Sequence, residues 1–264
     1  MFVICYIAWS GRRKHEIHSR VSWFQNKCMK KTLESMSREV SIIKQSSIDK
    51  QDTETVERLL LSLHEAVAEG DKESLAQISE SLQRFWSRDQ VLQKVNDVER
   101  LQSEEAGVSV AYLLSDEFLQ LAQERSEETD PTFYQLKDAF FFGHSGHSAI
   151  GTEKMCPRDG ELGCSFLDAL PRKYRRKATH FLSWTWAYHI KMFRACISAW
   201  IREKRLDPEF TFLYCCFFVN NQHRLLVQNV ANGSDDLESV FEERLKRIGV
   251  MVAMLDNWSQ PVSF

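Results

Sequence analysis

Three groups of residues in the second half of the chain have side chains suited to binding a small planar molecule. Indole and phenol rings offer stacking surfaces, and hydroxyl and carboxamide groups can hydrogen-bond to polar atoms of a ligand. The residues predicted to bind a ligand are Ser183, Trp184, Trp186, Tyr188, Asn220, Asn221 and Gln222. The third group begins with Asp256, the only carboxylate at the end of one of the predicted strands. Each group also has a structural interpretation, because tryptophans can plug the core beneath a helix, Asn-Asn is common in turns and an aspartate can cap a helix.

Each group follows a short apolar run, and the three runs predict strands of one sheet. Residues 178–188, 210–219 and 249–255 are rich in β-branched or aromatic residues and bounded by polar ones, which is typical of strands buried on both faces. The segments between them have the apolar spacing of helices. Strands that alternate with helices predict a parallel sheet, whose carboxyl ends meet at one edge. We therefore expect the three groups to lie together at that edge.

Residues 144–177 form a glycine-rich entry segment that contains a second candidate site. Two histidines and two cysteines, His144, His147, Cys156 and Cys164, are ligand types that zinc accepts in a tetrahedral arrangement. Neither cysteine belongs to a Cys-x-x-Cys pair, so loop histidines and buried thiols are the alternative interpretation. The segment ends in the basic run 172–177, which is either a phosphate or nucleic-acid contact or a solvated turn before the first strand.

The first 143 residues predict helices and show no strand or hairpin signal. Apolar residues recur at helical intervals over residues 20–44 and 53–69, and again from residue 71, from residue 87 and within 110–125. Asp130-Pro131 predicts the cap and first turn of a further helix, which Gly143 ends. The expected organisation is a helical region over residues 1–143 (a bundle or an extended arm), the entry segment 144–177 and an α/β domain over residues 178–264.

Composition argues against several functional classes. The chain has 264 residues and a net charge of −3, which gives no general attraction to nucleic acid or to an anionic membrane. The seven cysteines are an odd number and two adjacent ones lie inside an apolar run, so we expect a reducing compartment and a cytoplasmic location. The apolar start, residues 1–9, is shorter than the about 20 residues of a membrane span. Its basic cluster follows it, unlike that of a signal peptide, so we expect a packed or frayed end.

Several segments together resemble a TIR-like family of large, mostly uncharacterised protist proteins. They are ATHFLSWTWAY at residues 178–188, FFVNNQHR at 217–224, VMVAMLDNWSQP at 250–261 and the preceding CPRDGELGCSFLDALP at 156–171. The resemblance covers about residues 153–264. It implies a flavodoxin-like fold, whose TIR relatives either assemble through TIR–TIR contacts or cleave NAD at the glycosidic bond.

The family pattern continues past Trp258–Pro261 into a Trp-Cys…Glu motif, whose glutamate is the essential carboxylate of catalytic relatives. This chain ends before that motif, so we expect an incomplete α/β domain of about three strands that is poorly soluble or oligomeric. In place of the glutamate, the resemblance leaves Asp256 as the candidate catalytic carboxylate. The expected function is that of an intracellular interaction or signalling protein, with protein partners that can include a second copy of the chain. The alternative is a hydrolase that cleaves NAD or processes nucleosides, for which NAD would be a substrate and not a cofactor.

Overall fold

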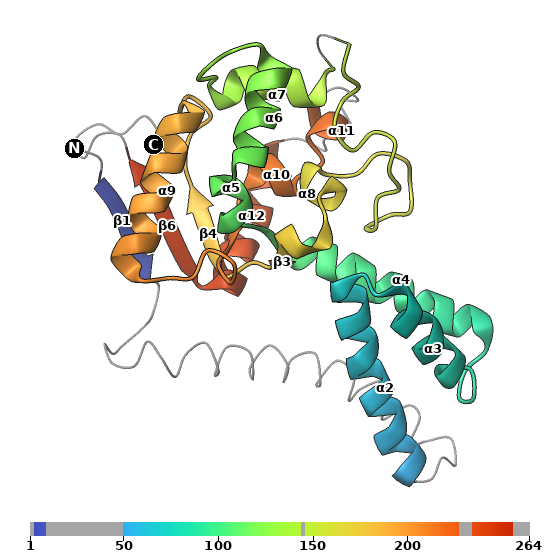
Figure 1. Ribbon diagram of the computed structural model, residues 1–264. Helices are drawn as coiled ribbons and strands as arrows, with labels where there is room; N and C mark the ends of the chain where they lie inside the picture. Colours follow the sequence, from blue (N-terminus) through green and yellow to red (C-terminus); the bar gives the residue numbers. More distant parts are fainter. Residues whose placement is uncertain (1–2, 9–49, 144–145, 227–233, 256–264) are drawn as a thin grey trace. The chain divides into compact units, whose positions relative to one another are not determined.

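The computed structural model of the chain describes residues 3–8, 50–143, 146–226 and 234–255. The chain divides into two compact units, one of residues 10–98 and the other of residues 1–9 together with residues 99–264. Figure 1 shows their helices and strands. The long helix α4 (Arg88–Glu105) contributes residues to both units.

The described residues of the smaller unit, 50–98, are helical, as the sequence predicts. Helices α2 (Lys50–Glu69) and α3 (Lys72–Leu82) pack with the first part of α4 around an apolar core. The buried residues of this core are Val56, Leu60, Leu63, Val67, Leu82, Val91 and Val98. The predicted capping box at the start of α4 is confirmed, because the Ser87 N–H donates to Gln90 Oε1 at 2.9 Å and the Gln90 N–H donates to Ser87 Oγ at 3.3 Å. The helix predicted over residues 20–44 lies outside the described residues.

The larger unit is built on a mixed sheet with the strand order β1-β6-β4-β5-β2-β3. The strands are β1 (Val3–Ala8), β2 (Ala106–Ser109), β3 (Arg175–Lys177), β4 (His180–Ser183), β5 (Phe212–Tyr214) and β6 (Val250–Leu255). Strand β4 pairs in parallel with both β5 and β6, which confirms the predicted set of adjacent parallel strands. Strand β1 pairs antiparallel with β6, and β2 pairs antiparallel with β5 and β3.

Two predictions about the strands are wrong. The first 143 residues do contain strands, β1 and β2, although no strand signal was expected there. The apolar runs 178–188 and 210–219 are only partly extended, because β4 ends at Ser183 and β5 ends at Tyr214. In the second run the remaining apolar residues form a short buried helix, and a short apolar run cannot by itself distinguish a buried strand from a buried helix.

Eight helices of the larger unit lie in the described residues. They are α5 (Val110–Leu114), α6 (Asp116–Ser126), α7 (Phe133–Phe141), α8 (Phe166–Ala169), α9 (Ile190–Lys204), α10 (Cys216–Val219), α11 (Gln222–Leu226) and α12 (Ser234–Ile248). A single 3₁₀ turn, Arg172–Tyr174, precedes β3.

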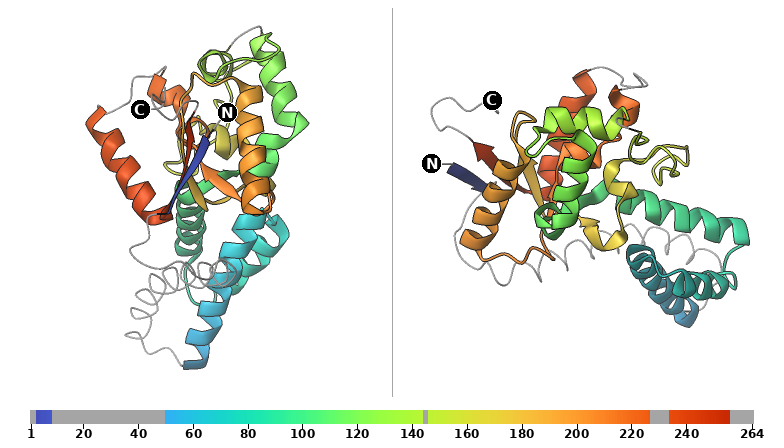
Figure 2. Two further views of the ribbon diagram at one scale, coloured as in Figure 1. Left: turned by 90° about the vertical axis from the view of Figure 1, so that its left-hand side faces the viewer. Right: turned by 45° about the horizontal axis from the view of Figure 1, so that its top comes forward.

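Helices α9 and α12 cover opposite faces of the sheet (Figure 2). The His180 ring lies 5.1 Å from that of Trp200 on α9, whereas the Phe181 ring lies 4.6 Å from that of Phe241 on α12. Successive side chains of a strand point to opposite faces, so these two contacts place the helices on opposite sides. The connections after β4 and after β5 therefore wind to different faces.

The division between the units does not coincide with the boundary expected at residue 143. Helices α5, α6 and α7 share one core with the sheet, in which Tyr112, Phe118 and Phe140 are at most 1% exposed. Phe118 contacts Phe218 at 5.5 Å between ring centroids, and Phe140 contacts Phe166 at 5.4 Å. An apolar stripe shows that a helix buries one face but not which element covers that face. The helices of residues 110–141 therefore belong to the α/β unit.

Gly107 permits a close crossing of the chain over β2. Strands β3 and β4 are separated by only two residues, yet β3 pairs with β2 and β4 pairs with β5. A Cβ atom on Gly107 would lie 2.8 Å from the carbonyl carbon and oxygen of Leu213 and 3.1 Å from the Cα of Ala178. The absent side chain thus allows three backbone segments to meet at this point.

Candidate functional site

The predicted site residues follow β4 and β5 at the carboxyl end of the parallel strands. Trp184, Trp186 and Tyr188 come directly after β4, whereas Asn220 to Gln222 come after β5 and the short helix α10. The third predicted group, including the catalytic candidate Asp256, lies outside the described residues.

The two tryptophans pack against neighbouring helices. The Trp184 ring meets that of Phe133 on α7 edge to face at 4.3 Å and that of Phe193 on α9 at 5.1 Å. The Trp186 ring meets Phe217 on α10 at 5.3 Å and Tyr134 on α7 at 6.0 Å. These are the distances and angles of ordinary aromatic packing, so both indoles help to close this end of the sheet.

The segment after β4 is held in place from both sides. The buried Tyr188 donates its hydroxyl hydrogen to the carbonyl oxygen of Met254 on β6 at 3.0 Å. The backbone N–H of Tyr134 donates to the carbonyl of Trp186 at 3.1 Å, and that of Phe133 donates to Tyr188 at 3.2 Å. This segment therefore fastens α7 to the central strands.

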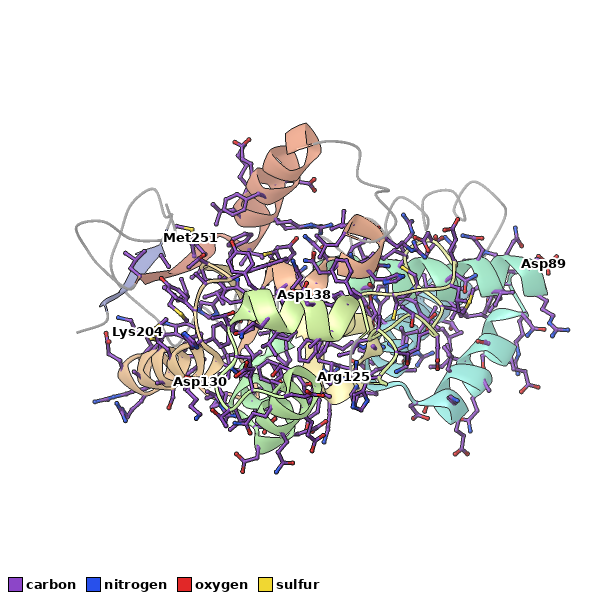
Figure 3. The ribbon with its side chains drawn as sticks, turned by 90° about the horizontal axis from the view of Figure 1, so that it is seen from above. Asp89, Arg125, Asp130, Asp138, Lys204 and Met251 are labelled. Atoms are coloured by element: carbon purple, nitrogen blue, oxygen red, sulfur yellow. The ribbon has the colours of Figure 1, made fainter. Side chains whose placement is uncertain are left out.

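Asp130 caps a different helix from the one that the sequence predicts. Its carboxylate accepts a hydrogen bond at 2.9 Å from the N–H of Lys191, in the first turn of α9, and Figure 3 labels Asp130 near the start of that helix and Lys204 at its end. Thr132 caps α7 instead, in a capping box with Gln135. The negative charge of Asp130 interacts favourably with the N-terminus of α9. The sequence pattern does not predict this cap, because the two residues are far apart in the chain.

The carboxamides predicted to bind a ligand are hydrogen-bonded within the chain. Asn221 Nδ2 donates to the carbonyl of Gly163 at 2.8 Å, and the buried Gln222 donates through Nε2 to the carbonyl of Cys216 at 2.8 Å. Asn220 Oδ1 lies 3.5 Å from the Tyr214 hydroxyl, which donates to it. Ser183 is half-buried at the end of β4. The structure brings Trp184, Trp186 and Asn220 close to α10, while Asn221 turns away towards Gly163.

The adjacent thiols between β5 and α10 are not activated nucleophiles. Burial raises the pKa of Cys215 well above its ordinary value, and it also raises the pKa of Cys216. A thiol with a raised pKa is protonated at neutral pH and reacts slowly, because the thiolate is the nucleophile.

Three cationic residues of the basic run 172–177 are paired with carboxylates of the same unit. The ion pairs are Arg172–Glu99 at 2.9 Å, Arg175–Asp168 at 3.0 Å and Lys177–Glu105 at 2.7 Å. Positive side chains that already have carboxylate partners are poorly placed to attract a phosphate. This arrangement favours the structural interpretation of the run over an anion site.

The three predicted zinc ligands in the described residues do not form a metal site. His144 lies outside the described residues, His147 is exposed, and Cys156 and Cys164 are buried. Within the described ranges, no group of three or more histidine, cysteine or acidic residues could hold a metal ion. Burial raises the pKa of Cys164 to about 11, which opposes the thiolate form that a metal requires.

The structure contains a buried polar network around Asp168 that the sequence analysis does not predict. The Asp168 carboxylate accepts hydrogen bonds from Ser103 Oγ at 2.8 Å, Ser165 Oγ at 2.7 Å and Arg175 Nη1 at 3.0 Å. Arg158 lies 3.7 Å from the same carboxylate and donates through Nε to Ser103 Oγ at 2.9 Å. The Ser-x-x-Asp spacing of Ser165 and Asp168 is the one local signal for part of it, because such spacing is typical of a helix start.

The same glycine-rich segment forms a compact surface loop over residues 151–164, which we call the Ω-loop. Its ends meet where the Cys164 N–H donates to the carbonyl of Gly151 at 3.0 Å. Met155 and Leu162 pair across the loop, and the Cys156 N–H donates to Glu161 at 2.7 Å. Met155 is 62% exposed and Leu162 is 63% exposed. Directly opposed residues of such a bridge have neighbouring side chains, so these two, here called the 155/162 pair, form one apolar patch.

Comparisons with family models, curated proteins and solved structures gave no match to this chain. Among the described helices, none has the length and apolar character needed to cross a lipid bilayer.

Proposed function

We propose that this chain acts by binding proteins, including a second copy of itself, through the 155/162 pair on the Ω-loop. The observation that carries the proposal is the exposure of two large, adjacent apolar side chains on an ordered loop. Single exposed apolar residues are common on protein surfaces and need no explanation, whereas a contiguous apolar patch is typical of an interaction surface.

The loop is already ordered by contacts with the rest of the unit. Arg224 pairs with Asp159 and donates to the carbonyl of Leu162 at 3.1 Å, and Lys154 Nζ donates to the carbonyl of Ala169 at 2.6 Å. A surface that is rigid before binding loses little conformational entropy when a partner arrives. Two apolar side chains held in this way are suited to act as the centre of an interface.

The carboxyl end of the sheet supports binding over catalysis. Its indoles pack into the aromatic core, its carboxamides bond within the chain, and the thiols of Cys215 and Cys216 have raised pKa values. The packed indoles and bonded carboxamides serve the fold, and the protonated thiols are poor nucleophiles. Among the described residues of this edge, none favours the hydrolase alternative.

We also propose that the α/β unit is TIR-like and that the protein is cytoplasmic. The TIR-like fold is supported by the strand order β5-β4-β6 and by the position of α9 and α12 on opposite faces. Doubly wound flavodoxin-like sheets have the same order, with the first strand between the second and the third. The antiparallel strands β1 and β2 depart from that pattern. The free thiols of Cys156, Cys164, Cys196, Cys215 and Cys216 support a reducing compartment.

Sedimentation velocity of the purified chain over a range of concentrations tests the interaction function. We expect self-association that weakens about 30-fold in the Met155→Ser/Leu162→Ser double variant, which is the size of effect seen for interface hot spots. Phe210→Ser is the matched control, because Phe210 is a large apolar side chain that is 76% exposed outside the loop. A wild-type chain that remains monomeric at every concentration, or an equal effect of both changes, would show that the 155/162 pair does not mediate assembly.

A further inference from the structure

The Ω-loop is bonded internally by its backbone but attached to the rest of the unit through side chains. In the described structure, the backbone hydrogen bonds donated by Lys154, Cys156, Gly160 and Gly163 all go to carbonyls within the loop. The loop can therefore move as one body without losing these bonds. Its attachment depends on a small number of side-chain contacts.

Besides Lys154, which bonds to Ala169, Arg158 points from the loop into the unit. Its Nη2 atom donates to the carbonyl of Val219 at 2.8 Å and to that of Ser103 at 3.2 Å, in addition to the Nε bond to Ser103 Oγ. Through Asp168 it also joins the buried network that contains Arg175. One guanidinium thus connects the loop to α4, to α8 and to the end of α10.

The carboxylate that receives Arg158 does not depend on it. Asp168 keeps hydrogen bonds from Ser103, Ser165 and Arg175, and its contact with Arg175 at 3.0 Å is shorter than its contact with Arg158 at 3.7 Å. Removing the only partner of a buried charge is strongly unfavourable, but here Asp168 remains paired when Arg158 leaves. Release of Arg158 is therefore much less costly than disruption of the whole network.

Glycines at both ends of the loop provide points of rotation. Gly151 has a φ of +84° and Gly163 has a φ of +95°, a region of backbone conformation that other residues rarely adopt. A Cβ atom on Gly151 would lie 2.5 Å from the carbonyl oxygen of Cys164, so the neck of the loop accepts only glycine there. Residues at the ends of a moving segment absorb its change in backbone angles.

We propose that Arg158 and its receptor around Asp168 form a latch, which holds the Ω-loop closed and opens by rotation at Gly151 and Gly163. Closure fixes the 155/162 pair in one orientation and keeps Cys156 and Cys164 buried. Opening exposes both thiols and moves the apolar patch. The resulting control of assembly rests on the proposed function, whereas the latch itself does not.

The thiols of the chain report directly on the latch. We expect Arg158→Met to increase the rate of alkylation of Cys156 and Cys164 by iodoacetamide at least about tenfold under native conditions, as the loss of hydrogen bonds from a charged group predicts. Cys196 and Cys215, buried in the core outside the loop, should keep their wild-type rates. Peptide mass spectrometry of the full chain measures each cysteine separately. Arg172→Met is the control, because it removes an ion pair with Glu99 that does not touch the loop.

Three results would overturn the latch. They are unchanged labelling of Cys156 and Cys164 in Arg158→Met, a rise shared equally by all four thiols, and the same selective rise in Arg172→Met. A general rise would indicate global destabilisation instead of loop opening. Selective labelling combined with unchanged self-association would support the latch and contradict the role of the loop in assembly, so the two proposals can fail separately.

Discussion

Asp168 is a carboxylate whose side chain is only 2% exposed, with two arginines within 4 Å of it. Replacing it by asparagine leaves the guanidinium groups of Arg158 and Arg175 without their negative partner in a largely buried place. We expect Asp168→Asn to lower the free energy of unfolding by about 3–5 kcal/mol, the range for breaking a buried ion pair from one side.

Chemical denaturation measures this loss, with Glu99→Gln as the control. Glu99 also pairs with an arginine, Arg172, but its side chain is 32% exposed, so its removal should cost less than about 1 kcal/mol. Equal losses in the two variants would contradict the importance assigned to the Asp168 network.

His180 predicts a dependence of stability on pH. Burial lowers its pKa from 6.5 to about 4, so the folded chain binds this proton less readily than the unfolded chain does. The contribution to stability is complete above pH 6.5 and is lost as the pH falls from 6.5 towards 4. Unfolding experiments on wild type and His180→Gln between pH 7.5 and 4.5 isolate the contribution of His180 to the free energy of unfolding, because the two proteins share all other acid-sensitive groups. Parallel pH profiles of the two proteins would show that His180 does not titrate as the burial implies.

At the scale of elements, the sequence predicts what is local and leaves out what depends on pairing. Strands β4, β5 and β6 were predicted because each lies in an apolar run bounded by polar residues, and their parallel arrangement followed from the helices between them. Strand β2 could not be predicted, since its four residues follow α4 directly and no turn residue separates them. Its pairing with β5 and β3 joins segments far apart in the sequence.

The candidate site shows the same limit. The sequence identifies Trp184 and Trp186 at the end of β4, but the direction of their rings is set by Phe133, Phe193 and Phe217 on three different helices. The sequence pattern places the helix that carries Phe133 in a separate helical region, whereas in the structure it packs on the α/β core. Without that helix in place, an open aromatic edge and a closed one have the same sequence pattern.

Gly107 gives a prediction about the central crossing. We expect Gly107→Ala to destabilise the chain by about 2–3 kcal/mol, because the new methyl group would meet the backbone of Leu213 at 2.8 Å, and a backbone atom has little freedom to move away. Gly160→Ala is the comparison variant: nothing lies within 4 Å of the added carbon, so only its positive φ opposes the change, at a cost of roughly 1 kcal/mol. Thermal unfolding compares the two variants. A Gly107→Ala protein as stable as the control would mean that the crossing is looser than described.

On the scale of the whole molecule, the parallel strands are not left with bare edges. A sheet of only three strands would have unpaired edges and would be poorly soluble. In the structure, β1 pairs with the outer edge of β6 and β2 pairs with the outer edge of β5. These antiparallel strands come from segments predicted to be a packed end and part of a helical region. The parallel strands therefore offer no unpaired edge in the described structure, and the proposed assembly uses the exposed apolar patch of the Ω-loop.

The most direct test of that account is site-specific photocrosslinking at position 155. With p-benzoylphenylalanine incorporated in place of Met155 in the full chain, irradiation should produce a species of twice the chain mass whose crosslinked peptides join two copies. The same group at position 210 should yield little of this species, since Phe210 is exposed outside the Ω-loop. Crosslinks confined to a single chain, or an equal yield from both positions, would contradict assembly through the 155/162 pair.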